Sequence, residues 1–324
     1  MPDQKKNSSI FNFNSSQRKF LNYLGIFFIP IIGIAVALEI LVVDLPSPFK
    51  IVGEYIEQEA DDIEVAVFGS SQIKNSVNPE FLDKNTLNIS SSAQHHNTDF
   101  NLLKGLVDRL PNLNTVVFEV SYGHFEIPHN SKYYWKNSVY LKYYDINTFG
   151  RPTGPADNLL FISHPGYFSN QFVDYYLRDS LPYQYNKWGF DNNFYEGKFR
   201  KLNYDIEAIE KSTVKINRGE NIRTLKYNVE YFEQMLEFCY ERGIKVVIIS
   251  PPTFRNYNEK RDKNILRRRD SVLAVLQSKH EGLVFLNAET DPLFKVRDFR
   301  NENHLNPHGA KKFSLQLNKV LNQN

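Results

Sequence analysis

The sequence lacks the features that mark several common functional classes. Its one cysteine, Cys239, excludes an internal disulfide and a CxxC metal site, and its place in an amphipathic run predicts a buried core thiol. The formal net charge of +2 gives no electrostatic basis for nucleic-acid binding. There is no glycine-rich phosphate loop and no set of metal ligands at helical or zinc-finger spacing, so we expect neither a nucleotide cofactor nor a metal.

The longest apolar run extends from Phe20 to Val43 and is interrupted only by Asn22 and Glu39. At about 1.5 Å per residue it is long enough to cross a hydrocarbon core of about 30 Å. Most of the charged residues before this run are basic, and most of the charged residues directly after it are acidic. The positive-inside rule therefore predicts a cytoplasmic tail (1–19), a membrane helix (20–43) and a main domain that is periplasmic or on the cell surface.

A cleaved signal peptide is the competing interpretation, because Ala35-Val36-Ala37 resembles an A-x-A cleavage site. The apolar run continues past this point through Leu41-Val42-Val43, which favours an uncleaved anchor. A buried helix of a soluble protein is a third alternative. The length of the run and its one-sided flanking charge argue against it.

A linker is expected at residues 44–60, and residues 61–324 then alternate between strand and helix patterns. Apolar strands separated by amphipathic helices predict an α/β domain, a parallel sheet in three layers. The expected strands are Glu64–Phe68, Thr86–Ile89, Thr115–Val120, Lys245–Ile249 and Leu283–Leu286, and the expected helices are Phe100–Arg109, Arg223–Arg242, Lys263–Lys279 and Gly309–Leu321.

The strand–helix alternation stops at residues 122–221, a segment rich in tyrosine, phenylalanine, glycine and proline. We interpret it as an insertion that caps the rim of the sheet, with short helices at most. Its aromatic side chains suit stacking on sugars. The alternative is that a cap without regular structure needs them for a small core of its own.

Two polar segments follow predicted strands at opposite ends of the domain. Gly69-Ser70-Ser71 forms a sharp turn after the first strand, and His304 lies in the loop before the last helix, where Asn306 can cap and Pro307 fits the first turn. In parallel sheets the ligand crevice lies beyond the carboxyl ends of the strands. The serine turn and His304 are therefore expected on the same rim.

These segments resemble the first and last blocks of the SGNH (GDSL-like) hydrolase superfamily. The last block corresponds here to His304-Leu305-Asn306-Pro307-His308-Gly309-Ala310. More narrowly, the chain looks like the membrane-anchored bacterial members found with cell-envelope polysaccharide and O-acylation systems. The resemblance covers about residues 61–321 in strand order and depends on two short motifs.

The resemblance assigns roles to individual residues. It makes Ser71 the nucleophile and His304 the general base. The segment Asn88–Gln94 resembles the second block, with Ala93 where the family has a glycine whose amide helps to form the oxyanion hole. The backbone N–H groups of Ser71, Ala93 and Gly123 are the implied oxyanion donors.

The sequence departs from the family pattern at two points. The third block should supply an asparagine, but Ser121-Tyr122-Gly123-His124 has none, which leaves His124 or a backbone amide as the substitute. The family aspartate three residues before the histidine is Asn301 here. Glu302 could take its role in a shifted geometry, and Asp298 is a weaker substitute.

The resemblance implies a membrane-anchored serine esterase or O-acyltransferase. It would act through an acyl-serine intermediate on acyl groups of a cell-envelope glycan or on a small acyl ester. The alternative is a catalytically degenerate SGNH fold that binds glycan or scaffolds an envelope assembly complex. Asn301 and the missing third-block asparagine are explained best by this second hypothesis.

Simpler roles exist for the individual residues. Ser71 could cap a helix or belong to a turn, and His304 could be a solvated loop residue. Glu119, a charge inside an apolar strand, needs a partner, and a structural ion pair is the favoured explanation. His95-His96 has no further ligands at metal-site spacing, which favours a polar loop.

Overall fold

The computed structural model describes residues 14–129, 134–180 and 183–323 and has the expected α/β architecture. Its main sheet has five parallel strands in the order β2-β1-β3-β4-β5. Each strand begins and ends within one residue of its predicted position. The strands are β1 (Val65–Phe68), β2 (Thr86–Asn88), β3 (Thr115–Glu119), β4 (Lys245–Ser250) and β5 (Val284–Asn287).

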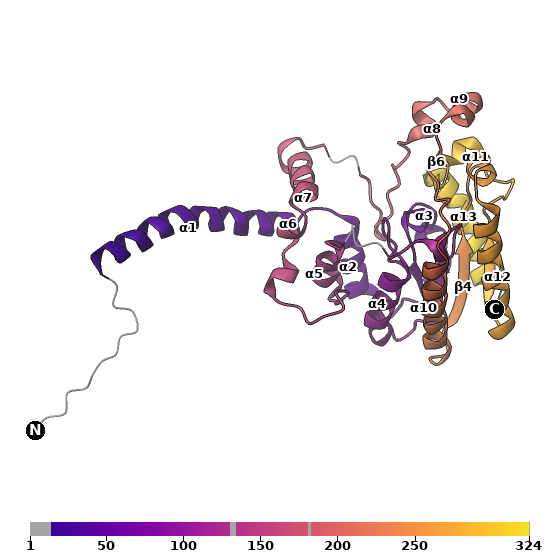
Figure 1. Ribbon diagram of the computed structural model, residues 1–324, viewed down its shortest axis with the longest axis horizontal. Helices are drawn as coiled ribbons and strands as arrows, with labels where there is room; N and C mark the ends of the chain where they lie inside the picture. Colours follow the sequence, from indigo (N-terminus) through magenta and orange to yellow (C-terminus); the bar gives the residue numbers. More distant parts are fainter. Residues whose placement is uncertain (1–13, 130–133, 181–182, 324) are drawn as a thin grey trace, which may run out of the picture.

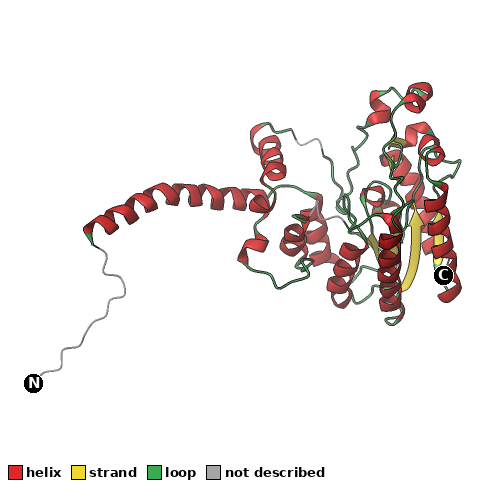
Figure 2. Ribbon diagram, viewed as in Figure 1, coloured by secondary structure: helices red, strands yellow, loops and turns green. Residues whose placement is uncertain are grey.

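The four predicted helices are also present, and they cover both faces of the sheet (Figures 1 and 2). The last one begins as expected, because Asn306 accepts a hydrogen bond from the backbone N–H of Gly309 at 3.1 Å and Pro307 occupies the first turn. The helices are α4 (His96–Leu106), α10 (Ile222–Tyr240), α12 (Lys263–Lys279) and α13 (Pro307–Leu321).

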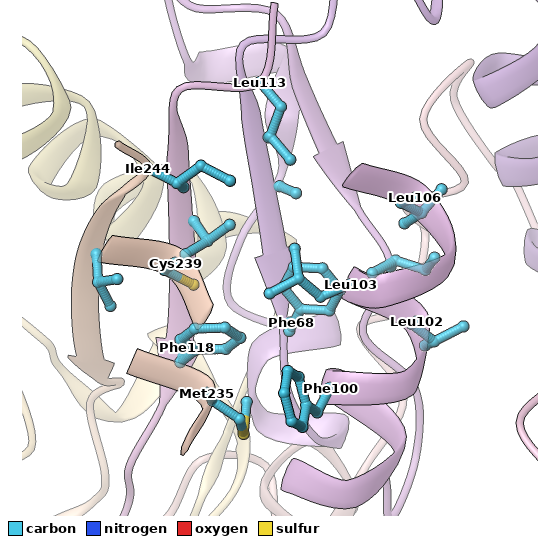
Figure 3. Close-up of a cluster of buried hydrophobic side chains, with 14 of the residues drawn as sticks. Phe68, Phe100, Leu102, Leu103, Leu106, Leu113, Phe118, Met235, Cys239 and Ile244 are labelled. Atoms are coloured by element: carbon cyan, nitrogen blue, oxygen red, sulfur yellow. The ribbon is translucent and has the colours of Figure 1, made fainter. Parts of the chain in front are cut away.

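Successive strand residues point to opposite faces, so the apolar strands supply two cores. Phe68 and Phe118 pack against α4 and α10, as Figure 3 shows, and Cys239 is buried in this core as predicted. Val67 and Val117 face the other core, which includes Phe313 of α13. The two cores hold the strand ends, and thus the rim above them, in place.

The N-terminal apolar segment forms one long helix, α1 (Ser15–Val43), whose side chains are mostly exposed. Its length and composition are sufficient to cross a membrane, as for an anchor or a signal sequence. The helix starts earlier than residue 20 because Asn14 caps it, accepting a hydrogen bond from the Gln17 N–H at 2.9 Å. Residues 1–13 of the predicted tail lie outside the described residues.

Most of the expected linker is a helix, α2 (Pro48–Glu59). Ser47 caps it, and Val52, Tyr55 and Ile56 are buried in the core that contains Phe68. The apolar side chains at helical spacing (52, 55 and 56) stabilise this helix, and Pro48 is compatible with it because it occupies the first turn. The domain therefore begins closer to α1 than predicted.

The segment between β3 and α10 forms two groups of short helices rather than one (Figure 1). One group contacts α1 and α2, and the other lies beside β6 (Phe299–Asn301) and α11 (Arg255–Glu259). Tyr140, Phe168 and Phe199 are buried, in agreement with aromatics that form local cores. The first group is α5 (Lys136–Tyr144), α6 (Leu160–Ser163) and α7 (Pro165–Phe172), and the second is α8 (Lys198–Lys201) and α9 (Ile206–Lys211).

Candidate functional site

The turn after β1 presents Ser71 at the carboxyl edge of the sheet. Gly69 has φ 149°, and a Cβ there would lie 2.6 Å from Ile73 Cγ1 and 2.8 Å from Glu119 Oε2, so a side chain would not fit. Ser70, not Ser71, caps the short helix α3 (Ser71–Lys74), because its Oγ accepts a hydrogen bond from the Gln72 N–H at 3.2 Å. The Ser71 hydroxyl is thereby left for another partner.

That partner is His304, which comes from the opposite end of the chain. His304 begins the short strand β7 (His304–Leu305), which pairs antiparallel with β6. Its Nε2 lies 2.8 Å from Ser71 Oγ. The predicted meeting of the two side chains on one rim is therefore what the geometry shows, and the solvated-loop alternative for His304 does not fit.

Asn301 determines which nitrogen of His304 carries the proton. Asn301 Oδ1 lies 3.0 Å from His304 Nδ1 and 3.1 Å from the backbone N–H of Asn303. A backbone N–H can only donate, so this atom of the amide must be the oxygen, and Nδ1 must donate to it. The lone pair of His304 is then on Nε2, facing the Ser71 hydroxyl, as a general base requires.

Burial makes His304 a weak base. Burial and, to a smaller extent, the nearby Arg300 cation together lower the imidazole pKa to about 4. The ring is therefore neutral at pH 7 and can accept a proton. Asn301, being neutral, orients the imidazole without giving the imidazolium the stabilisation that a carboxylate would.

The two acidic residues that could replace Asn301 as the partner of His304 bind other groups. Glu302 forms an ion pair with Lys198 of α8. Asp298 accepts hydrogen bonds from Lys312 Nζ at 2.9 Å and from the Lys295 N–H at 2.7 Å. Asn301 is thus the orienting group of His304 in this arrangement.

Glu119 at the end of β3 supports the turn that carries Ser71. Its side chain is buried, and its two oxygens accept hydrogen bonds from the Ser70 N–H and the Ser121 hydroxyl, both at 2.6 Å. The expected ion pair is wrong: the nearest cationic candidate, His124 Nδ1 at 3.9 Å, is neutral because burial holds its pKa well below 6.5. Burial also raises the pKa of Glu119, and Ser121 and Ser70 oppose this shift.

A cavity of about 310 Å³ opens beside the turn that carries Ser71; Ser70 and Gln72 line it, and Ser71 and His304 lie next to its lining residues in the chain without being among them. Ser70, Ala93, His124 and Asn303 are among the residues that line it. Ala93 has φ 55°, in the left-handed region that glycine adopts without strain. Gly123 is not among the lining residues, and a Cβ added to it would lie 3.9 Å from Ile265 Cγ2 of α12.

The expectation of a polar loop at His95-His96 is wrong. Both rings are buried, with His124, where the start of α4 meets the end of β3. The hydrophobic surroundings come from packing partners distant in sequence, such as Phe232 of α10, whose ring centroid lies 4.6 Å from that of His96. The His95-His96 pair in the sequence does not indicate which side chains pack against it.

The donor atoms of His95, His96 and His124 lie within 4.8 Å of one another, so they are the described residues best placed to hold a metal ion. Their present geometry does not suit one. Both nitrogens of His95 already have backbone partners, the His96 N–H at 2.9 Å and the His124 carbonyl at 3.0 Å. The rings of His96 and His124 stack with an interplanar angle of 25°, so their lone pairs run side by side instead of converging.

Comparison with protein-family models found no match for this chain, and comparison with curated proteins found no significant similarity. The local geometry is therefore the basis for assigning a function. Sequence patterns located Ser71, His304 and Asn301, but not the turn-supporting role of Glu119 or the effect of Arg300 on His304. The one signal for Glu119 was a charge within an apolar strand.

Proposed function

We propose that this chain is a membrane-anchored serine esterase or O-acyltransferase that works through an acyl-Ser71 intermediate. The observation that carries the proposal is the relay from Ser71 Oγ to His304 Nε2 and from His304 Nδ1 to Asn301 Oδ1. A serine hydroxyl is a weak nucleophile until a base removes its proton, and an oriented neutral imidazole is the usual base. The resemblance to SGNH hydrolases in the same residues supports this assignment.

In the first half-reaction, Ser71 Oγ attacks the ester carbonyl carbon while its proton moves to His304 Nε2. A C–O bond forms, and the carbonyl oxygen becomes an oxyanion. When the tetrahedral intermediate collapses, the bond to the leaving alcohol breaks and that alcohol takes the proton from Nε2. The product is acyl-Ser71 with a neutral imidazole.

In the second half-reaction, water or a sugar hydroxyl gives its proton to His304 Nε2 and attacks the acyl carbon. Collapse returns the proton to Ser71 Oγ and releases the free acid or the new ester. Hydrolysis and transfer differ only in which hydroxyl enters the site. Neither half-reaction requires a cofactor.

The oxyanion needs N–H donors aimed at the same point. The backbone N–H groups of Ser71 and Ala93 make no hydrogen bond of 3.5 Å or less to a described residue, so both are available as donors. For the third donor we propose His124 instead of Gly123. His124 lines the cavity, and its buried Nε2 has no partner among the described residues.

The substrate class remains an acylated envelope glycan or a small acyl ester. A cavity of about 310 Å³ with tyrosine and asparagine side chains in its wall, among them Tyr122, Asn217 and Tyr257, offers both ring faces and hydrogen-bonding groups to a sugar. The long apolar α1 would hold this cavity near a membrane. Both features favour a polymer or lipid-linked substrate over a freely diffusing one.

Fluorophosphonate labelling of the full-length chain in detergent tests the proposal. We expect the wild type to be labelled, and Ser71→Ala and His304→Ala to lose the label, since general-base catalysis contributes roughly 10²–10⁴-fold. Ser92→Ala and His308→Ala, changes at exposed side chains, should label like the wild type. A folded wild type that takes up no label would contradict the enzyme hypothesis.

One observation favours the second candidate, a degenerate SGNH-like fold that binds glycan. Asn301 is neutral, and replacing the corresponding aspartate by asparagine in a serine protease lowers kcat by about 10⁴-fold. Tight glycan binding by an unlabelled wild type would support this candidate. The binding should then be unaffected by Ser71→Ala.

A further inference from the structure

A group of apolar side chains is exposed beside the end of α1. They belong to α6 and to the π-helix η6 (Val173–Leu177) that follows α7. Single exposed apolar residues are common, but four within sixteen positions, close to an apolar helix, need a partner. The group, here the apolar patch, is Ile162 (57% exposed), Tyr175 (39%), Tyr176 (39%) and Leu177 (69%).

Hydrogen bonds attach α6 and η6 to the C-terminal end of α1. The Glu39 carboxylate accepts from the backbone N–H groups of Leu160 and Phe161, the latter at 2.9 Å. The Tyr176 hydroxyl donates to the Leu41 carbonyl at 3.0 Å. Val42 of α1, Leu160 of α6 and Phe168 of α7 also belong to one buried cluster. We therefore expect α6, α7 and η6 to move together with the end of α1.

The charges of α1 show where a bilayer would begin and end. Residues 20–38, between Lys19 and Glu39, contain no charged side chain. These 19 residues span about 28 Å at about 1.5 Å each, close to the hydrocarbon thickness of about 30 Å. Glu39 therefore marks the outer boundary, and the first turn of α6, bonded to Glu39, lies at the same depth.

We propose that α6, α7 and η6 lie on the outer surface of the bilayer, with the apolar patch inserted at the boundary between headgroups and hydrocarbon. Tyrosine is enriched at this depth, where its ring is apolar and its hydroxyl meets water. Figure 1 shows α6 and α7 on the side of the domain from which α1 leaves. The proposal depends on the anchor role of α1 that the proposed function includes.

The contact would orient the domain as well as tether it. A single helix leaves the domain free to rotate and tilt, whereas a second contact beside it restricts both motions. Surface insertion of this kind scales with the apolar area buried and needs no specific lipid. The cavity beside Ser71 would then keep a constant height above the membrane, where a lipid-linked acyl acceptor would meet it.

Site-specific labelling of the full-length protein in phosphatidylcholine vesicles tests the proposal. The native Cys239 is buried, and burial raises its thiol pKa to about 12, so the unmodified chain serves as the blank. The test variants Ile162→Cys and Leu177→Cys carry an NBD fluorophore. Val275→Cys, an equally apolar and exposed position on α12 (50% exposed), is the matched control, and Phe28→Cys within α1 reports on the anchor.

We expect brominated lipid to quench the probes at 162 and 177 about twofold relative to the probe at 275, and the probe at 28 at least as strongly. Quenching at 28 with none at 162 and 177 would overturn the surface contact and leave the anchor intact. Absence of quenching at all positions would overturn both. Probes at 162 and 177 that are shielded from water but not quenched would show a second copy of the chain on the patch, which also overturns the proposal.

Discussion

At the carboxyl edge of the sheet, His304 and a stack of three other histidines have different surroundings. His304 has a side-chain partner on each nitrogen, Ser71 at 2.8 Å and Asn301 at 3.0 Å. The stack of His95, His96 and His124 packs ring on ring; its hydrogen-bonded nitrogens have backbone partners, and His124 Nδ1 lies 3.9 Å from the Glu119 carboxylate. Burial lowers the pKa of all four rings, so burial alone does not distinguish a catalytic histidine from a structural one.

The difference lies in orientation. Asn301 and Asn303 determine the tautomer of His304 and aim its lone pair at a hydroxyl. In the stack, His96 donates through Nε2 to the Glu119 carbonyl, and its Nδ1 stays buried without a described partner. A histidine is a base where polar neighbours specify its lone pair, and a packing unit where aromatic rings surround it. Three variants test this contrast.

The largest effect is expected at His124, which lines the cavity together with His95 and whose buried Nε2, unlike the nitrogens of His95, has no described partner. His124→Phe keeps an aromatic ring in the stack but removes the proposed oxyanion donor. We expect the acylation rate with an activated ester to fall about 10²-fold, in line with the loss of one such donor. His129→Phe, a change at a histidine that lines only the neighbouring cavity, is the control and should leave the rate unchanged. Equal rates for both variants would contradict the donor role.

A smaller effect, of opposite sign, is expected from Asn301→Asp. A carboxylate at this position would stabilise the imidazolium and raise the pKa of His304 from about 4. We expect acylation at pH 7.5 to accelerate by about tenfold and the ascending limb of the pH–rate profile to move from near pH 4 toward pH 6. Asn301→Leu, which removes the acceptor, should slow the reaction. A profile that does not move in Asn301→Asp would show that Asn301 does not orient the base.

The smallest effect is expected from His96→Phe, which replaces one aromatic ring by another against Phe232. At pH 7.5 the free energy of unfolding should change by about 1 kcal/mol or less, because one hydrogen bond is lost and an unpaired nitrogen is removed with it. Thermal unfolding of the full-length protein in detergent measures the change. A much larger loss would show that His96 has a role beyond packing.

The same variant should resist acid better than the wild type. The folded pKa of His96 is lowered, so the unfolded chain binds more protons below about pH 6.5. The contribution of the neutral, buried His96 to the free energy of unfolding is therefore complete above that pH. It is lost as the pH falls, by up to about 1.4 kcal/mol per pH unit. The buried carboxyl groups of Asp99 and Glu119 have raised pKa values and shift stability in the opposite direction.

The fold was predictable because it depends on patterns within short stretches of chain. The five strands appear as apolar runs of four to six residues, and α13 begins where Asn306 and Pro307 predict. The helix α2 was missed although its apolar side chains have helical spacing, since Pro46 and Pro48 suggested a linker. Proline in the first turn is compatible with a helix, as it is at Pro307.

The site was predictable only in part. The positions of Ser71 and His304 follow from the rule that parallel strands end on one rim, together with the resemblance in the flanking residues. The bond of Glu119 to the Ser70 N–H and the burial of His95 and His96 against the ring of His124 depend on groups more than twenty residues away. Such contacts produce no periodic pattern in the sequence.

Local chemistry therefore determined the strands, the helix caps and the two segments that carry Ser71 and His304. Packing between distant elements determined the tautomer of His96, the bonds to Lys198 and Lys312 that keep Glu302 and Asp298 from His304, and the position of α6 against Glu39. The physical reason is the range of the interactions. Backbone conformation and capping are satisfied within a few residues, whereas a buried polar atom takes whichever partner the folded chain brings within about 3 Å.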